Sequence, residues 1–559
     1  MFPEIILKNK KIIDSSFLES DFLDLLLKNR KIKKTDYGHF FKPYFPTDSD
    51  FNINKKELKK ATNRVNLAIK NNENILIYGD YDVDGITATA ILWRVLYQLG
   101  AKVLPFIPDR ETDGYGINSK SFFDFETQKN IHFDLLITVD NGIVANSEFE
   151  KIAKKNTDII IVDHHLPTKD LPKVSAIIHS TNFSGAALSW FFATQFDKNA
   201  DIGLAAAGTV ADCLPLVGVN RSIVIHGLKS LQSKPNHGIK KLIEVSGIKQ
   251  DSISAYDLGF VIGPRINAVG RLSNPTEALR LLCSQNSTQA GKYATNLDKF
   301  NKDRQDIQKE NLKIAEEIIS RDVLQNVSIQ VGNKLIFISH KEFLPGIIGL
   351  IAGRLTEKYY LPSIIVSIGD EYSKGSCRSI KELNIVEALR QFNDDLVDLG
   401  GHAGAAGFTI KTTNIKKFQT KITNYINQQL KNIDLKPAIT VESEMKLSAV
   451  TIKNCRLIGK FEPFGIDNPK PLFLFKNLRI IQKRVIGFTG DHLKLKLDDP
   501  ECKGDSCGRP IPADAIAFKK GELDGQFKNG DLVNIIASLD LNVWNGQTFP
   551  QLIVKEIFA

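Results

Sequence analysis

The chain has 559 residues, of which 42% are apolar and 25% are charged, and it carries a net charge of +9. This length predicts roughly three or four domains, each with a sizeable core. The composition is typical of a globular protein, and the mild basicity permits nucleic-acid binding without proving it. The sequence contains no internal repeat, no low-complexity tract and no apolar run of about 18 residues, which argues against a membrane-spanning helix.

Six cysteines are scattered along the chain, which is not a disulfide framework and indicates a reducing compartment. They are Cys213, Cys283, Cys377, Cys455, Cys502 and Cys507. The last two form half of a zinc-binding pattern, but no second pair lies nearby. The first residues contain neither an apolar signal core nor a cleavage site, so we expect a cytoplasmic protein.

Strands alternate with helices between residues 51 and 285, which we interpret as one α/β domain. After a helix at 55–70, the expected strands are 75–78, 103–107, 135–139 and 159–162, with helices at 86–99 and 147–155 among them. Alternation at this spacing predicts a parallel, doubly wound sheet. We expect residues 1–50, which alternate between charged and aromatic segments, to wrap this first domain.

Three of these strands are followed directly by residue types that bind metals. They are Asp80, Asp82 and Asp84, then Asp140, then Asp163, His164 and His165. Parallel strands bring their carboxyl ends to one edge of the sheet, where such folds bind ligands. Each aspartate alone could simply cap the helix after it, but helix capping explains the whole set poorly. The first three also begin like a calcium loop, which would need a Glu where Ile91 stands. The set therefore predicts a metal site.

A further carboxylate, Asp212, lies in the apolar segment 203–217, which we predict to be a helix. A carboxylate inside such a helix is costly unless it is paired or binds a cation. A structural ion pair is one explanation, and the nearby ligand types favour metal binding.

Three further units are expected after the first domain. Segment 286–326 is charged and free of proline, which predicts an exposed connecting helix. Residues 327–430 contain strands at 334–339 and 363–367 around a helix at 346–360, which predicts a second α/β domain. The third unit comprises residues 438–559.

Glycine-rich segments at 374–379 and 400–408 lie in this second α/β domain. Glycine-rich backbone that opens a helix binds anions through free N–H groups and the helix dipole, so both segments are candidate phosphate sites. Close backbone packing is the simpler alternative. Segment 258–272 also sets two arginines among glycines, where guanidinium groups can approach phosphate.

Residues 438–559 alternate polar and apolar side chains between glycine-containing turns, which predicts a small β-barrel such as an OB-fold. Its aromatic and basic side chains could stack bases and bind phosphates, although at least half of the aromatics should be core. The candidates are Phe461, Phe464, Phe473, Phe475, Phe488 and Trp544, with Lys483, Arg484, Lys494 and Lys496.

Taken in order, these motifs resemble those of a known family. Asp80–Gly85, Val139–Ile143, Val162–His165 and Gly208–Asp212 are similar to the four motifs of DHH-family phosphoesterases. Segments 263–271 and 400–408, the latter in the associated DHHA1 domain, and the region from Pro463 onward resemble the RecJ single-strand-specific DNA exonucleases. The resemblance covers almost the whole chain. It fails at Ile177-Ile178-His179, where relatives carry Asn-Pro, and at an insert from about 499 to 512.

The resemblance implies a phosphodiesterase that uses two Mn²⁺ or Mg²⁺ ions, which suit mixed carboxylate and imidazole ligands. It implies that Asp140 bridges the ions, that Asp82, with Asp80, binds one, and that Asp84, His164 and Asp212 bind the other. His165 would contact the scissile phosphate and Asp163 would orient the two histidines. Water would attack phosphorus without a covalent intermediate.

It also implies 5′→3′ removal of nucleotides from single-stranded DNA, in repair and recombination, at a cleft between the two α/β domains. The residues expected to hold the substrate are Arg110, Arg271, Ser376, Arg378, Gly401 and His402, with Ser376 and Arg378 at the 5′ end. We expect a monomer that binds no membrane, with a helicase and a single-strand-binding protein as partners. The alternatives are a nanoRNA or cyclic-dinucleotide phosphodiesterase, an inorganic pyrophosphatase, and a non-catalytic scaffold of a replication or repair complex.

Overall fold

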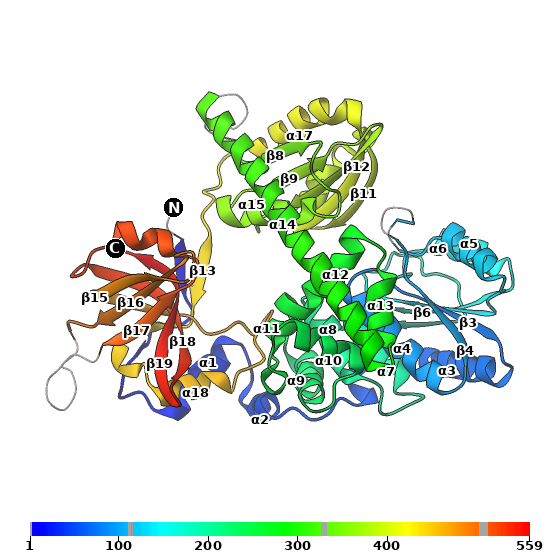
Figure 1. Ribbon diagram of the computed structural model, residues 1–559, viewed down its shortest axis with the longest axis horizontal. Coiled ribbons are helices and arrows are strands. Elements are labelled where there is room, and N and C mark those ends of the chain that lie inside the picture. Colours follow the sequence, from blue (N-terminus) through cyan, green and yellow to red (C-terminus); the bar gives the residue numbers. More distant parts are fainter. Residues whose placement is uncertain (1–2, 110–112, 115, 326–332, 502–511) are drawn as a thin grey trace.

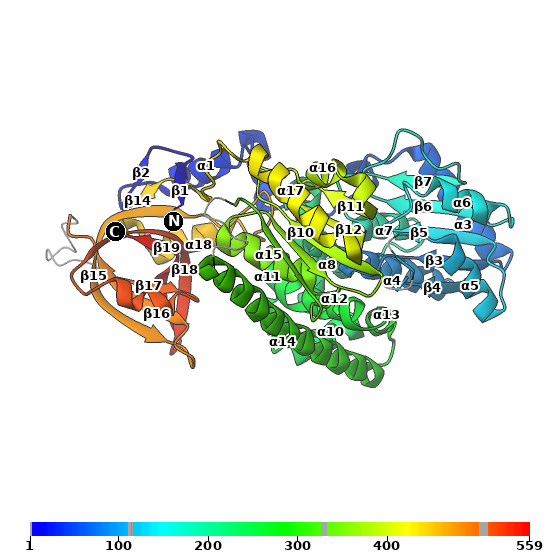
Figure 2. The ribbon, with the colours of Figure 1, turned by 90° about the horizontal axis from the view of Figure 1, so that it is seen from above.

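The computed structural model describes residues 3–109, 113–114, 116–325, 333–501 and 512–559. Two α/β domains are joined by the long helix α14 (Ser287–Gln325), and a β-barrel lies to one side (Figure 1). In both ribbon views the barrel lies at one end of the molecule and the sheet of the first domain at the other (Figure 2). Within the described residues, no helix combines the length and the apolar character needed to cross a membrane.

The first domain is built on the predicted parallel sheet, with strand order β4-β3-β5-β6-β7. The strands are β3 (Asn74–Tyr78), β4 (Lys102–Phe106), β5 (Leu135–Val139), β6 (Asp158–Asp163) and β7 (Ala176–His179). The order reverses at the β3–β5 pair, and ligands bind such sheets outside the strand ends at this point. The expected α/β class is confirmed, and the site-bearing loops follow β3, β5 and β6.

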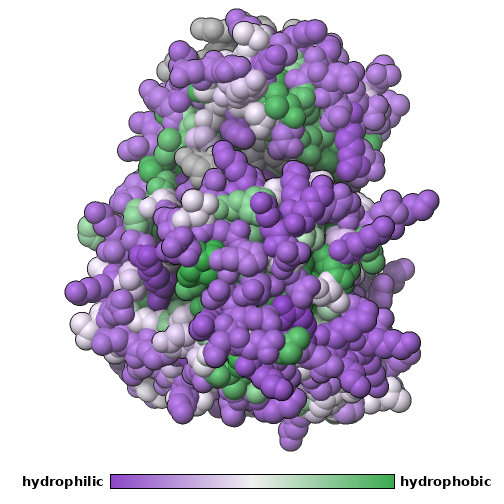
Figure 3. All heavy atoms as spheres, turned by 90° about the vertical axis from the view of Figure 1, so that its right-hand side faces the viewer, coloured by the Kyte–Doolittle hydropathy of each residue, from purple (hydrophilic) through white to green (hydrophobic). Residues whose placement is uncertain are grey.

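Both faces of this sheet are covered by helices, which explains the unbroken apolar runs of its strands. Alternate residues of β3 enter two different cores: Ile75 and Ile77 pack with α3, α4, α7 and α8, whereas Leu76 and Tyr78 pack with α5 and α6. These helices are α3 (Lys55–Lys70), α4 (Val83–Gln98), α5 (Ser119–Lys129), α6 (Asn146–Ala153), α7 (Gly185–Ala193) and α8 (Ile202–Ala211). The outer end of this domain presents mostly hydrophilic side chains (Figure 3).

The helix expected at 203–217 is shorter than predicted. It ends at Ala211, and Asp212 is its C-cap, because Cys213 takes a left-handed backbone conformation with φ of 57°. Asp212 therefore lies at the end of the helix rather than inside it.

The second α/β domain has the strand order β11-β12-β10-β9-β8, with α15 (Ile348–Tyr359) packed on β9 and β10. Its strands are β8 (Ile336–His340), β9 (Ser363–Ser367), β10 (Tyr372–Arg378), β11 (Leu396–His402) and β12 (Ala405–Lys411). The glycine-rich segments lie in β10 and in the β11–β12 hairpin, so the expectation that they open helices is wrong. The ring of Phe408 fills the space that a side chain at position 375 would need. Close packing, the simpler alternative to a phosphate site, therefore explains Gly375.

The C-terminal region forms the predicted barrel of five strands. They are β15 (Phe473–Ile486), β16 (His492–Asp498), β17 (Ala513–Ala517), β18 (Leu532–Trp544) and β19 (Gln547–Phe558). The order β16-β17-β19-β18-β15 closes because β15 also pairs with β16. Phe461, Phe473 and Phe475 are core residues, as expected for at least half of the aromatics, while Phe488 and Trp544 are exposed.

The N-terminal residues differ from expectation, because they mainly cover the C-terminal domain and not the first one. Strand β1 (Glu4–Leu7) pairs with β13 (Ala438–Val441), and β2 (Ile12–Ile13) pairs with β14 (Glu444–Met445). Helix α1 (Glu19–Asn29) buries its apolar face, with Phe22 and Leu26, in the core of the barrel domain. The end of the segment contacts the first domain, where the ring of Phe45 packs against Trp190 and His226.

Candidate active site

The loop after β3 places three aspartates at the start of α4. Asp82 is the N-cap residue, and its Oδ1 accepts a hydrogen bond of 3.1 Å from the backbone N–H of Gly85. Asp84 lies in the first turn of the helix and is buried. Gly85 packs directly against Asp80, because a β-carbon at Gly85 would lie 2.6 Å from that of Asp80. The turn therefore holds three carboxylates close together.

Asp84 is held by a second helix. Its Oδ2 accepts a hydrogen bond of 2.6 Å from the N–H of Gly185, and its Oδ1 accepts one of 2.9 Å from the N–H of Ala186. These are the first N–H groups of α7, and the positive end of the helix dipole stabilises a carboxylate there. The carboxylate orientation is thus fixed before any ligand binds.

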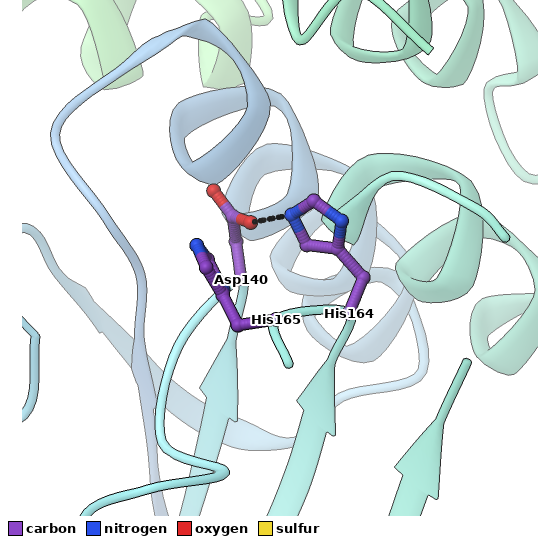
Figure 4. Close-up of side chains that lie close together, drawn as sticks. All are labelled: Asp140, His164 and His165. Carbon is purple, nitrogen blue, oxygen red and sulfur yellow. Dashed lines mark ion pairs between the residues drawn. The ribbon is translucent and has the colours of Figure 1, made fainter. Parts of the chain in front are cut away.

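Asp140 follows β5 in an unusual backbone conformation. Its φ is 61°, in the left-handed region that non-glycine residues adopt at a cost of order 1 kcal/mol. The N–H of Asp140 donates to the carbonyl of Val162 on the neighbouring strand at 2.9 Å, which anchors this conformation. The buried side chain points to His164, whose Nε2 lies 3.1 Å from its Oδ1 (Figure 4).

His164 lies among three carboxylates. Besides Asp140, its Nε2 is 3.6 Å from Oδ2 of Asp212 and 3.8 Å from Oδ2 of Asp84. Burial lowers the pKa of His164, and this favours the neutral imidazole that a metal ligand requires.

Asp163 organises the adjacent His165. Its Oδ1 lies 2.8 Å from Nδ1 of His165 and accepts the N–H groups of His164 and His165, while Oδ2 accepts the N–H of Ile143. Burial opposes the charged form of Asp163, yet these hydrogen bonds keep its pKa below its usual value. Burial also opposes the charged form of His165, but Asp163 outweighs this and raises the pKa of His165 to about 9. Nε2 of His165 is thereby suited to donate a hydrogen bond.

The carboxylates of this edge repel one another. Burial, followed by the charge of Asp84, raises the pKa of Asp82 and, more strongly, that of Asp140. Burial and the charges of Asp84 and Asp82 raise the pKa of Asp212 to about 8. A cation bound among these groups would offset the repulsion and favour the charged forms of Asp82, Asp140 and Asp212.

The donor atoms fit divalent cations. Three groups have donor atoms within 4.8 Å of one another: Asp80, Asp82 and Asp140; Asp84, His164 and Asp212; and Asp140, His164 and His165. Oxygen donors with one or two imidazoles suit Mn²⁺, and Mg²⁺ where nitrogen donors are fewer. Glycines at 185 and 208 leave the space these carboxylates occupy, since a side chain at either position would overlap Asp140 or Asp84.

The predicted substrate-binding residues lie in several places. Ser376 and Arg378 lie together on β10 beside Gly349, in the first turn of α15. Gly401 and His402 lie exposed at the end of β11, and β12 separates them from β10. Arg110 lies outside the described residues.

Segment 258–272 contains two arginines with different roles. One is a predicted substrate-binding residue, and the other stabilises the fold. On α12 (Gly263–Leu272), Arg271 donates through Nη1 to the carbonyl of Gly346, just before α15, at 2.9 Å. It therefore links the two α/β domains. Arg265 forms an ion pair of 2.9 Å with Asp298 of α14, so it anchors the connecting helix.

Sequence reasoning missed the backbone donors of the site. The N–H groups of Gly185 and Ala186 hold Asp84, but Ser184-Gly185-Ala186 reads only as an ordinary N-cap before an apolar helix. A metal-ligand residue type provides a signal in sequence, whereas a backbone N–H does not.

Family models match three parts of the chain. They are the DHH family N-terminal domain over residues 74–214, the DHHA1 domain over 332–428, and the RecJ OB domain over 441–556. All three matched segments follow one another in the order expected from the motifs.

Similar proteins agree with these matches. The chain is 33% identical to the single-stranded-DNA-specific exonuclease RecJ of Bacillus subtilis over 91% of its length, and it spans 64% of that protein. It is 30% identical to RecJ of Thermus thermophilus over 88% of its length and spans 69% of that relative. The chain belongs to the RecJ family.

The fold of the family extends over nearly the whole chain. The crystal structure of Thermus thermophilus RecJ in complex with Mn²⁺ superimposes with a TM-score of 0.79 at 27% identity, covering 96% of this chain and 76% of that one. The complex of the same protein with Mg²⁺ gives 0.75 at 26% identity, covering 96% and 74%. The Thermus thermophilus protein thus binds the two cations for which the donor set at this sheet edge is suited.

Proposed function

We propose that this protein is a metal-dependent exonuclease that removes nucleotides from single-stranded DNA in the 5′→3′ direction, in DNA repair and recombination. The observation that carries the proposal is the position of Asp140. Its carboxylate belongs to two donor groups at once, one with Asp80 and Asp82 and one with His164. A carboxylate shared by two cation sites can hold two metal ions close enough to act together on one phosphodiester bond.

The donor groups support a division of the ligands. Asp140 would contact both cations, Asp80 and Asp82 would hold one, and Asp84, His164 and Asp212 would hold the other. Two divalent cations at this edge would acidify an attacking water and stabilise the negative charge on the phosphate in the transition state. Asp84 keeps its orientation through the N–H groups of α7.

The histidine pair has separate tasks in this mechanism. His165 would donate a hydrogen bond through Nε2 to an oxygen of the scissile phosphate, while Asp163 orients the ring through its contact with Nδ1. The charge of Asp163 favours the protonated ring, which is the form that donates at both nitrogens. Asp163 acts through His165 and is a positioning residue.

The second α/β domain and the barrel would hold the strand. Ser376 and Arg378, beside the first turn of α15, would bind the 5′ phosphate, and the planar guanidinium of Arg378 matches phosphate oxygens. Arg271, Gly401, His402 and Arg110 would contact phosphates further along. The barrel would hold the incoming strand, with Phe488 and Trp544 as exposed stacking side chains.

The partners and the state of the protein remain predictions. We infer a monomer in the cytoplasm that works with a helicase and a single-strand-binding protein. The sequence motifs of the family, which occur in enzymes that act on free strands, are the basis for this expectation.

One set of assays tests the proposed activity. Labelled single-stranded DNA, duplex DNA, short RNA and a cyclic dinucleotide are each incubated with the protein and Mn²⁺, or with EDTA. We expect mononucleotides released from the 5′ end of single-stranded DNA, and none with EDTA. Preferred hydrolysis of short RNA or of the cyclic dinucleotide would refute the proposal in favour of the alternative phosphodiesterases. No hydrolysis of any substrate with Mn²⁺ would favour the scaffold.

Asp140→Asn tests the metal assignment. This variant should lose hydrolysis by at least about 1,000-fold, because removing one of a set of groups that act as a unit costs factors of this order. Its binding to single-stranded DNA should persist. Asp124→Asn, an exposed residue of α5 in the same domain, is the matched control. Substantial Mn²⁺-dependent activity in Asp140→Asn would contradict the shared-ligand role.

A further inference from the structure

Two exposed aromatic side chains stack on each other at a turn that packs against α8. The ring centroids of Tyr256 and Phe260 are 4.9 Å apart, with an angle of 27° between the ring planes. Tyr256 is 66% exposed and Phe260 is 70% exposed. Two large rings held in water cost free energy, because apolar surface that could be buried remains hydrated.

The backbone that carries the two rings is anchored to the core of the first domain. Tyr256 lies in α11 (Ala255–Asp257), which begins with a capping box formed by Ser254 and Asp257. Phe260 lies in the π-helical turn Leu258–Ile262, and such turns occur often at functional sites. Leu258 and Ile262 of this turn are buried in the core of the first domain. The turn is therefore held by its buried residues, while the two rings remain exposed to solvent.

This turn packs directly on the elements that hold the metal-site carboxylates. A β-carbon at Gly259 would lie 3.3 Å from Val210, in the last turn of α8. A β-carbon at Gly263 would lie 3.7 Å from Val83 and 3.8 Å from Ala211. Val83 stands between Asp82 and Asp84, and Ala211 precedes Asp212 in the sequence. In both ribbon views α11 lies on the side of the first domain that faces the barrel (Figures 1 and 2).

We propose that Tyr256 and Phe260 form a stacking platform for bases of a single DNA strand between the metal edge and the barrel. This inference rests on the proposed exonuclease function. Every base has an apolar face, so two flat rings hold a strand without selecting its sequence, as a nuclease that degrades any sequence requires. The rings already stack on each other, so little side-chain freedom is lost when a base is added.

A second stacked pair in the same domain shows what a packing role looks like. Trp93 and Tyr97 stack at 4.8 Å on α4, and Tyr97 is 50% exposed. The indole N–H of Trp93, however, donates to the carbonyl of Val103 at 3.3 Å, and its ring is half-buried. This pair lies at the C-terminal end of α4, whereas the metal-site aspartates lie at the N-terminal end. Tyr97 is therefore the matched control.

The platform is tested by strand binding in the full-length protein. Tyr256→Leu/Phe260→Leu and Tyr97→Leu are each combined with Asp140→Asn to stop hydrolysis. Binding of a 5′-phosphorylated 20-nucleotide oligo-dT is measured by fluorescence anisotropy. Loss of one or two stacked bases predicts that the platform variant binds about 5- to 100-fold more weakly, whereas Tyr97→Leu binds as the parent does. Leucine keeps the apolar surface and removes the flat ring.

A scan with abasic sites locates the contact. Single abasic sites moved along the oligonucleotide should weaken binding to the parent at one or two adjacent positions and leave the platform variant insensitive there. Equal loss in parent and platform variant at every position, or unchanged binding of the platform variant, would overturn the platform. A parent protein that binds no single-stranded DNA would instead refute the proposed function, so the two failures are distinguishable.

Discussion

Gly185 lies so close to Asp140 that no side chain fits between them. A β-carbon at Gly185 would be 2.5 Å from the β-carbon of Asp140 and 2.7 Å from its Oδ1. The N–H of the same glycine donates to Asp84 at 2.6 Å. One residue without metal-binding chemistry therefore sets the positions of two carboxylates that we assign as ligands.

Gly185→Ala should reduce Mn²⁺ affinity about 10- to 100-fold, because displacing the groups that orient ligands has effects of this size. The secondary structure should be retained, since alanine is a better helix former than glycine. Calorimetric titration with Mn²⁺ measures the change. Gly291→Ala in α14 is the control, because a β-carbon there would meet nothing closer than 3.9 Å. Equal Mn²⁺ affinity in both variants would show that Asp140 tolerates displacement.

The crowded carboxylates predict a pH-dependent response to metal. The pKa of Asp212 is about 8 in the folded protein because of burial and the charges of Asp84 and Asp82, against 3.8 ordinarily. Between these values the folded state holds more protons than the unfolded state, so the metal-free fold loses stability as pH rises. Cations remove this penalty. We expect Mn²⁺ to raise Tm more at pH 8 than at pH 6, by differential scanning calorimetry.

Asp212→Asn tests the origin of that response. The neutral amide removes the part of the repulsion that involves Asp212, so the metal-free variant should melt at a higher temperature than the parent at pH 8. Its Tm should also respond less to Mn²⁺. A Tm increase with Mn²⁺ that is the same at pH 6 and pH 8 in the parent would show that the carboxylates are already paired without metal.

Most of the first domain could be predicted because its physics is local. Strands buried on both faces appear as unbroken apolar runs, and the turns after them carry the polar residues that a buried strand excludes. The order of strands then places Asp84, Asp140 and His164 at one edge. Parallel topology was enough to gather them, although it gave no information on which oxygen faces which nitrogen.

The structural predictions that proved wrong share one cause. A local sequence pattern does not show which distant residues a segment packs against. The apolar face of α1 shows that it is buried, but not that the barrel domain, with Phe473 and Phe475, covers it. Gly375 could equally open a helix or pass under an aromatic ring, and only the sheet decides this. The helix before Asp212 ends early because of the backbone at Cys213, where no glycine marks the turn.

The barrel loops provide the next prediction. Phe488 lies in the β15–β16 turn and Trp544 at the end of β18 before the β19 hairpin, and these two loops border the binding face of an OB-fold. Trp544→Ala should raise KM on a 30-nucleotide strand about 5- to 100-fold, the cost of one lost stack. The kcat on a hexanucleotide should change little. Steady-state kinetics on both lengths separates the two effects.

Two basic candidates of the barrel are already engaged. Lys483 forms an ion pair with Asp524 at 2.7 Å, and Lys494 lies 3.8 Å from Asp514. We therefore expect Lys483→Ala to alter the salt dependence of strand binding less than Arg484→Ala does.

The control for Trp544→Ala is Leu532→Ala, which changes an exposed aliphatic residue at the other end of β18. Equal KM in these two variants would remove Trp544 from the binding face.

Arg221 joins the first domain to the barrel domain and gave no signal in the sequence. It is 2% exposed on α9 (Gly218–Ser233), and burial beside Arg30 lowers its pKa to about 10. Its guanidinium lies 4.1 Å from the ring centre of Phe40. It donates to the carbonyls of Phe40, Phe461, Glu462 and Pro463 at 2.7–3.3 Å. Several carbonyls from two distant segments are thus satisfied by one planar group.

Arg221→Ala should lower the free energy of unfolding by at least about 2 kcal/mol, because buried carbonyls without donors cost about 1–3 kcal/mol each. Arg221→Lys should recover little of this, since an ammonium cannot donate to the same spread of acceptors. Urea denaturation measures the loss, and Arg280→Ala, at an exposed position on α13 (Thr276–Cys283), is the control. Because the junction also fixes the barrel relative to the metal edge, KM on long strands should rise while kcat on a hexanucleotide is retained. Full stability in Arg221→Ala would mean that water replaces the guanidinium at no cost. The barrel domain would then be held by its other contacts, such as the hydrogen bond from the N–H of Leu216 to the carbonyl of Ile466.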